Sequence, residues 1–107
     1  MNKKEIDEIE SLIVKIVANE VETEKDIAKN GLADSKYLTI AADYCRKMDQ
    51  ILTEQVTLSK YEVSKIFEDY LKHEKINEAS KRILKGCMER YFVGDKDLLF
   101  KKLFKKF

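Results

Sequence analysis

Proline is absent from this chain, glycine occurs only three times, and no proline-rich or Gly/Ser-rich stretch interrupts the sequence. Because linkers between domains are commonly rich in these residues, we expect a single helical domain over residues 1–107. No apolar run approaches the roughly 20 residues that a membrane-spanning helix needs. The charged N-terminus is unlike a signal peptide. We therefore expect a cytoplasmic protein without an integral membrane segment.

Cysteine and histidine, which commonly perform catalysis or bind metals, are scarce, and the abundant carboxylates are expected on polar helix faces. Cys45 and Cys87 are the only cysteines and form no C-x-x-C motif, which argues against a thiolate zinc site. Both fall at apolar positions, so we expect buried free thiols. His73, the only histidine, follows Asp69 by four residues, and we interpret it as a surface residue. With no Glu-x-x-His motif and no phosphate-binding glycine loop, we predict no enzyme activity and no cofactor.

The charge of the chain is nearly balanced in total but unevenly distributed. Residues 1–34 contain nine acidic side chains and five lysines, whereas residues 74–107 contain ten basic and five acidic side chains. Residues 35–73 are balanced. A basic final third can contact a polyanion, an acidic partner, or the acidic first third of its own fold. All three alternatives are compatible with the sequence.

Apolar residues recur at helical spacing along most of the chain, which predicts a mainly α protein with a compact bundle of four to six amphipathic helices. The first helix is expected to begin with a capping box formed by Asn2 and Glu5 and to continue to about Val21. A short second helix from Thr23 to Lys29 would follow. Gly31 is expected to end it, because glycine adopts the left-handed conformation at little cost.

The next expected helix begins at Asp34 or Ser35 and has the clearest apolar stripe of the chain. This stripe consists of Leu38, Ala41, Ala42, Cys45, Met48 and Leu52. Ser59 and Glu62 form a second capping box, which begins a helix with a buried apolar face. That face consists of Val63, Ile66, Phe67, Tyr70 and Leu71. Asn77 is expected to cap a further helix, whose inward residues are Ala79, Ile83 and Leu84.

Two structures are compatible with the sequence after Gly86. In one, the helix continues through Tyr91 and Asp95 caps a last amphipathic helix. In the other, Gly86 ends the helix, since a glycine inside a helix costs about 1 kcal/mol, and residues 87–100 form a β-hairpin around the turn Gly94–Asp95. The hairpin would make the fold a winged variant of the helix–turn–helix.

The basic final third favours a DNA-binding accessory or regulatory protein, which we expect to be a homodimer. Residues Lys60–Leu84 are compatible with a helix–turn–helix whose second helix places Lys81 and Lys85 one turn apart. Contacts from such residues to phosphates would give salt-dependent affinity for double-stranded DNA. The residues predicted to contact DNA are Asn77, Lys81, Arg82, Lys85, Arg90, Lys96, Lys101 and Lys102.

The alternative hypothesis is a helical protein–protein interaction module of the inhibitor or immunity type. The last segment, Asp97–Phe107, has lysines opposite leucine and phenylalanine side chains at helical spacing. An amphipathic segment of this kind can bind in the groove of a partner protein, lie on a membrane surface, or pack onto its own bundle. This hypothesis needs no chemical site, which agrees with the scarcity of catalytic residues.

Overall fold

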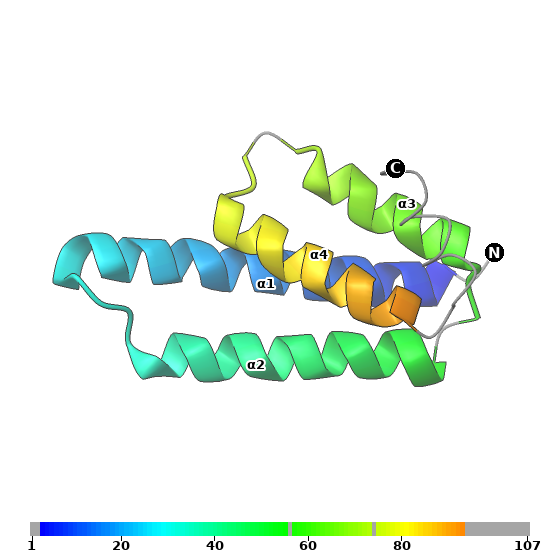
Figure 1. Cartoon of the computed structure of the whole chain (residues 1–107), viewed down its shortest axis with the longest axis horizontal. Coiled ribbons are helices and arrows are strands. Elements are labelled where there is room, and N and C mark those ends of the chain that lie inside the picture. Colours follow the sequence, from blue (N-terminus) through cyan, green and yellow to red (C-terminus); the bar gives the residue numbers. More distant parts are fainter. Residues whose placement is uncertain (1–2, 56, 74, 94–107) are drawn as a thin grey trace.

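The computed structural model describes residues 3–55, 57–73 and 75–93 (Figure 1). Its elements in chain order are α1 (Lys3–Asn30), α2 (Ser35–Gln50), the π-helical turn η1 (Ile51–Gln55), α3 (Lys60–Leu71) and α4 (Glu78–Val93). Within these ranges the structure contains four α-helices and no strand. The prediction of a mainly α fold is therefore confirmed.

The first helix is longer than the sequence pattern indicated. α1 is continuous from Lys3 to Asn30, so the predicted break after Val21 is wrong. Thr23, which we expected to cap a separate helix, lies inside α1 and its hydroxyl donates to the carbonyl of Asn19 at 2.8 Å. Threonine can make this bond one turn back without ending a helix. Gly31 does end α1 as predicted, with a φ of 83° that suits glycine.

The predicted beginnings of the three later helices are confirmed. Asp34 caps α2 through its side chain. Ser59 and Glu62 form the expected capping box at the start of α3. At the start of α4, the side-chain oxygen of Asn77 accepts a hydrogen bond from the backbone N–H of Ser80 at 2.9 Å. Each of these contacts satisfies a backbone N–H that the helix itself leaves without a partner.

α4 continues through Gly86 and Tyr91 to Val93, so of the two structures that the sequence left open the continued helix is confirmed, and the β-hairpin at residues 87–100 is wrong over residues 87–93. The helix continues because Cys87 has no exposed surface and Tyr91, one turn later, packs against the core. Burial of these side chains offsets the cost of about 1 kcal/mol for an interior glycine. Residues 94–100 lie outside the described residues. A winged helix that uses residues 87–93 as a strand is excluded.

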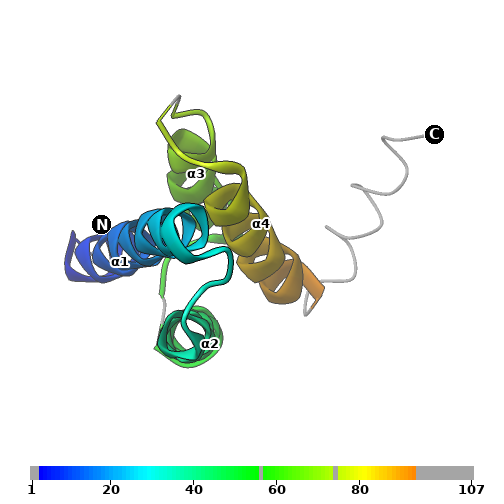
Figure 2. The ribbon, with the colours of Figure 1, turned by 90° about the vertical axis from the view of Figure 1, so that its left-hand side faces the viewer.

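The helices form a layered bundle. α1 lies between α2 and α3, and α4 packs beside α1 and contacts both α2 and α3 (Figures 1 and 2). α2 and α4 run in the same direction, and α1 and α3 run in the opposite one (Figure 1). The core between them contains the largest fully buried side chains, which are Ile9, Ile13, Ile16, Met48, Val63, Phe67, Leu84 and Cys87.

Polar contacts attach α3 and the loop before it to α1. Both carboxylate oxygens of Glu5 accept hydrogen bonds from Thr57, one from its backbone N–H and one from its hydroxyl, each at 2.7 Å. The Asn2 half of the predicted capping box lies outside the described residues. Farther along, the Tyr70 hydroxyl donates to Glu10 at 3.0 Å. Burial and the hydrogen bond to the Glu10 carboxylate raise the pKa of Tyr70.

Candidate functional site

Three of the residues predicted to contact DNA share the outward face of α4. Arg82 and Lys85 are exposed and Lys81 is half-buried. Their spacing places all three on one side of the helix. Glu78 and Glu89 lie on the same side and are exposed, and Lys81 forms an ion pair with Glu78 at 3.4 Å. The face therefore carries three cationic and two anionic groups, which makes it a weakly basic surface.

The other predicted residues do not join this face in the part of the chain that the structure describes. The Nε of Arg90 is 2.8 Å from a carboxylate oxygen of Asp49 on α2, and its Nη2 is 3.3 Å from the sulfur of Cys87. Asn77 caps α4, as described above. The remaining predicted residues, which lie outside the described residues, are Lys96, Lys101 and Lys102. The described residues therefore do not form one continuous basic ridge.

Arg82 also lies near enough to the acidic first helix for its charge to act on Glu20. Glu20 of α1 is buried, and its burial raises its pKa, as does the negative charge of Glu24. The positive charge of Arg82 opposes this effect and lowers the pKa of Glu20. Part of the basic charge of α4 is thus directed at acidic residues of α1. That arrangement corresponds to one of the three alternatives that the charge distribution left open.

Replacing Glu20 with glutamine is expected to stabilise the protein at neutral pH. The pKa of Glu20 in the folded protein lies above the ordinary value of 4.5. The protonated Glu20 side chain therefore contributes fully to stability only below pH 4.5. This contribution is lost as the pH rises through the pKa of the folded protein. At pH 7, Glu20→Gln should raise the free energy of unfolding by up to about 1 kcal/mol. This gain in the free energy of unfolding should vanish near pH 3.5, about one pH unit below the ordinary pKa of glutamate.

Urea unfolding followed by circular dichroism at both pH values measures this difference. Glu22→Gln is the matched control, because Glu22 lies on the same helix and is exposed. It should change the free energy of unfolding by less than about 0.5 kcal/mol at either pH. A lower stability of Glu20→Gln at neutral pH would show that attraction to Arg82 outweighs the cost of burial.

The helices α1 and α2 extend beyond α3 and α4 at the end where they are connected (Figure 1). Ile27 lies on the same side of α1 as the fully buried Ile9, yet 46% of its surface is exposed. Leu38 lies on the same side of α2 as Cys45, which packs against the core, yet it is 64% exposed. Leu32, in the connection, is 82% exposed. We call the surface formed by Ile27, Leu32 and Leu38 the hairpin tip.

The predicted apolar stripe of α2 is therefore only partly an interior surface. Met48 and Leu52 at its end are buried, and Cys45 in its middle is half-buried. Leu38 and Ala42, near its beginning, are exposed. The spacing of the stripe correctly identified which side of the helix is apolar. It carried no information on how far along the helix that side is covered.

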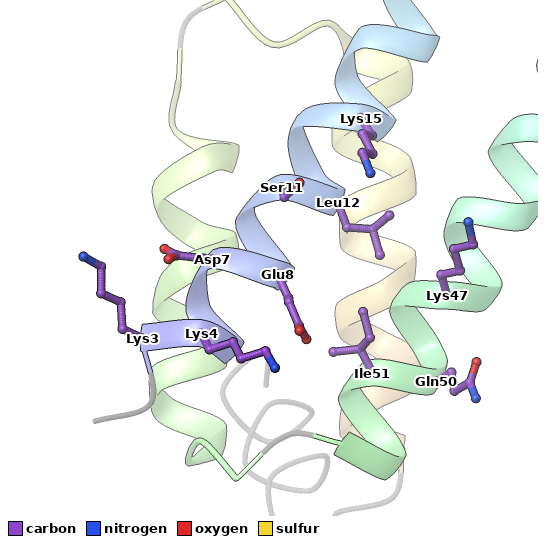
Figure 3. Close-up of a pocket in the computed structure, with 10 residues that line it drawn as sticks. All are labelled: Lys3, Lys4, Asp7, Glu8, Ser11, Leu12, Lys15, Lys47, Gln50 and Ile51. Carbon is purple, nitrogen blue, oxygen red and sulfur yellow. The ribbon is translucent and has the colours of Figure 1, made fainter.

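A groove of about 850 Å³ lies between the first half of α1 and the end of α2 (Figure 3). Leu12 and Ile51 contribute apolar surface to it. Its charged lining residues are Lys3, Lys4, Asp7, Glu8, Lys15 and Lys47. The charged part of the lining thus contains four lysines and two acidic side chains. The sequence analysis did not find the groove, because nothing local in the sequence shows that these two segments are neighbours.

A smaller pocket of about 230 Å³ lies between α1 and α3. His73 and Asp69 line it together with Glu10 and Tyr70. His73 is exposed, as predicted, and its Nδ1 accepts a hydrogen bond from the backbone N–H of Lys75 at 3.3 Å. Among the described residues, no group of three or more histidine, cysteine or acidic side chains is arranged to hold a metal ion.

No protein-family model, curated protein or solved structure matches this chain. Across residues 3–55, 57–73 and 75–93, no helix combines the length and the apolar character needed to cross a membrane. The features of this protein that bear on its function are therefore the surfaces described above. Of these, the hairpin tip is the surface on which exposed apolar side chains, Ile27 and Leu38 among them, lie where α3 and α4 do not extend.

Proposed function

We propose that the protein is a non-enzymatic helical module that binds a partner protein through the hairpin tip. The observation that supports this proposal is the exposure of Ile27, Leu32 and Leu38 at the place where α1 and α2 extend past α3 and α4. Single exposed apolar residues are common, but neighbouring ones that continue a buried stripe are typical of protein-binding surfaces. Covering them would stabilise a complex by about 25 cal/mol for each Å² of apolar area buried.

The connection that carries the hairpin tip is held in place by hydrogen bonds. One carboxylate oxygen of Asp26 accepts a bond from the side chain of Asn30 at 2.7 Å, and the other accepts a bond from the backbone N–H of Asp34 at 2.6 Å. Asp34 in turn caps α2. A surface that is ordered before binding loses less conformational entropy when a partner binds. These bonds therefore favour binding at the tip.

The partner element that fits this surface is an amphipathic helix with one apolar and one basic face. Residues 20–30 of α1 contain four acidic side chains and two lysines, and Asp34 adds a further acidic group beside the tip. An amphipathic helix binds through apolar residues three and four positions apart. Basic residues on its flanks would complement the acidic surroundings of the tip, which increases both specificity and the rate of association.

Leu38→Lys is expected to weaken binding of the partner by at least about tenfold, the effect of losing one strong interface contact. The same change should alter the free energy of unfolding by less than about 0.5 kcal/mol, because Leu38 is exposed. A photoreactive residue at position 32 would first cross-link the partner in its native cell, so that mass spectrometry can identify it. Calorimetric titration with the purified partner then measures the affinity.

Tyr61→Lys is the matched control, since Tyr61 is 74% exposed but lies on α3, away from the tip. This variant should bind with the affinity of the unchanged protein. Equal losses for the two variants would contradict the proposal. A cross-link from position 32 to a second copy of the chain alone, or to an acidic segment of the partner, would contradict it as well.

DNA binding is the second hypothesis, and the shared outward face of Lys81, Arg82 and Lys85 favours it. It has less support because acidic residues lie on that face and Arg90 is bound to Asp49. Titration with a long DNA duplex at increasing salt concentration tests it, since phosphate contacts predict an affinity that falls steeply with salt. No binding at low ionic strength would exclude it. The homodimer stays a prediction, which sedimentation equilibrium of the purified protein tests.

A further inference from the structure

The two cysteines meet between α2 and α4. The ion pair between Arg90 and Asp49, 2.8 Å long, sets the register of these two helices. Cys45 lies one turn before Asp49, and Cys87 lies one turn before Arg90, so the same register brings the two thiols opposite each other. Cys87 belongs to the core between the helices and Cys45 packs against that core, α2 contacts α4, and both cysteines are free thiols. The pair is 42 positions apart in the sequence, which is why sequence analysis treated each cysteine separately.

The two thiols differ in their access to solvent. Cys87 has no exposed surface, whereas Cys45 is half-buried. Burial, followed by the neighbouring Cys45 side chain, raises the pKa of Cys87 to about 12, although the positive charge of Arg90 opposes this shift. Cys87 is therefore a protonated thiol at neutral pH. A reagent from solution reaches the pair through Cys45.

We propose that Cys45 and Cys87 are a site of reversible oxidation, at which a peroxide converts them into a disulfide that joins α2 to α4. In the first step, the Cys45 thiolate attacks hydrogen peroxide, the O–O bond breaks, and an S–O bond forms. The products are the sulfenic acid of Cys45 and hydroxide, which takes up the proton released from the Cys45 thiol and becomes water.

In the second step, the sulfur of Cys87 attacks the sulfur of Cys45. The S–S bond forms as the S–O bond breaks, and the departing hydroxide takes the proton of Cys87 and leaves as a second water molecule. Two thiols have then lost two electrons, and one peroxide has become two molecules of water. The guanidinium of Arg90, 3.3 Å from the Cys87 sulfur, stabilises the negative charge that develops there. The dithiol is restored by exchange with an external thiol.

The test treats the full-length protein with hydrogen peroxide under native conditions. The intact mass should fall by the mass of two hydrogen atoms, and peptide mapping should find the linkage between Cys45 and Cys87. Dithiothreitol should reverse both changes. Because a cross-link restricts the unfolded chain, the oxidised protein should unfold at a temperature at least about 5 °C higher.

Cys45→Ser is the first control, and it should lose the mass change while keeping the helical circular dichroism of the unchanged protein. Because Cys87 is buried, Cys87→Ala serves beside Cys87→Ser in case the serine variant does not fold. Oxidation of Cys45 to higher acids without a linkage would overturn the proposal. Linkages only between molecules, or a linkage that forms only after unfolding in urea, would overturn it too.

Discussion

Replacing Phe67 with alanine is expected to destabilise the protein by about 3–5 kcal/mol, the usual cost of removing a buried phenylalanine. Phe67 lies on α3, has no exposed surface, and belongs to the same buried cluster as Ile13 of α1 and Leu84 of α4. The substitution removes apolar contacts and leaves a cavity that the neighbouring helices can fill only in part. Since small proteins are stable by only about 5–15 kcal/mol, much of the stability would be lost.

Chemical unfolding followed by circular dichroism measures this effect. Tyr61→Ala is the matched control on the same helix, because Tyr61 is 74% exposed, and it should cost less than about 0.5 kcal/mol. Phe67→Leu keeps most of the volume and should cost less than about 1.5 kcal/mol. If Phe67→Ala and Tyr61→Ala lowered the unfolding midpoint equally, α3 would not pack against the bundle as the structure describes.

The helix ends of this protein could be predicted from the sequence because the signals that determine them are local. Asp34, Ser59 and Asn77 each accept a hydrogen bond from a backbone N–H only two or three residues away. Such bonds depend on residue type and spacing alone. Gly31 likewise ends α1 through its own left-handed conformation. Each of these signals is contained within a few consecutive residues, so it can be recognised in the sequence.

The sequence pattern placed the end of the first helix wrongly after Val21 and left two structures open after Gly86, because local preference decides neither position. At Thr23, the hydroxyl donates to the carbonyl of Asn19 one turn earlier, whereas a cap would accept a bond from a later backbone N–H, and the helix continues. At Gly86, burial of Cys87 in the core holds the chain in a helix despite the glycine. Local propensity differs by about 1 kcal/mol or less at such positions. The free energy gained by burying one apolar side chain is comparable or larger.

The candidate surfaces were harder to predict, because charge and apolar spacing reveal side chains but not their partners. Arg90 was grouped with the basic residues, yet its partner Asp49 lies 41 positions away. Leu38 belongs to the predicted apolar stripe, yet it is 64% exposed. These outcomes depend on how the helices are placed side by side. The spacing of residue types along one sequence does not show that placement.

Glu5→Ala is expected to destabilise the protein by about 2 kcal/mol, although Glu5 lies on the first turn of α1, where single substitutions often have small effects. The Glu5 side chain is only 8% exposed, and its two oxygens accept bonds from the backbone N–H and hydroxyl of Thr57, 52 positions away. Hydrogen bonds to a charged group contribute about 1.5–3 kcal/mol. Their loss would free the segment before α3 from α1.

Glu8→Ala is the matched control for Glu5→Ala, because Glu8 is an exposed glutamate one turn later on α1. Both substitutions remove a negative charge near the start of the helix, which accounts for less than about 1 kcal/mol in either variant. A double-mutant cycle with Thr57→Val isolates the bond to the hydroxyl, and the two changes should be non-additive. Hydrogen exchange should also show faster exchange of the Thr57 amide in Glu5→Ala and not in Glu8→Ala. Equal effects of the two alanine variants, with additive double mutants, would mean that Glu5 acts through its charge and not through Thr57.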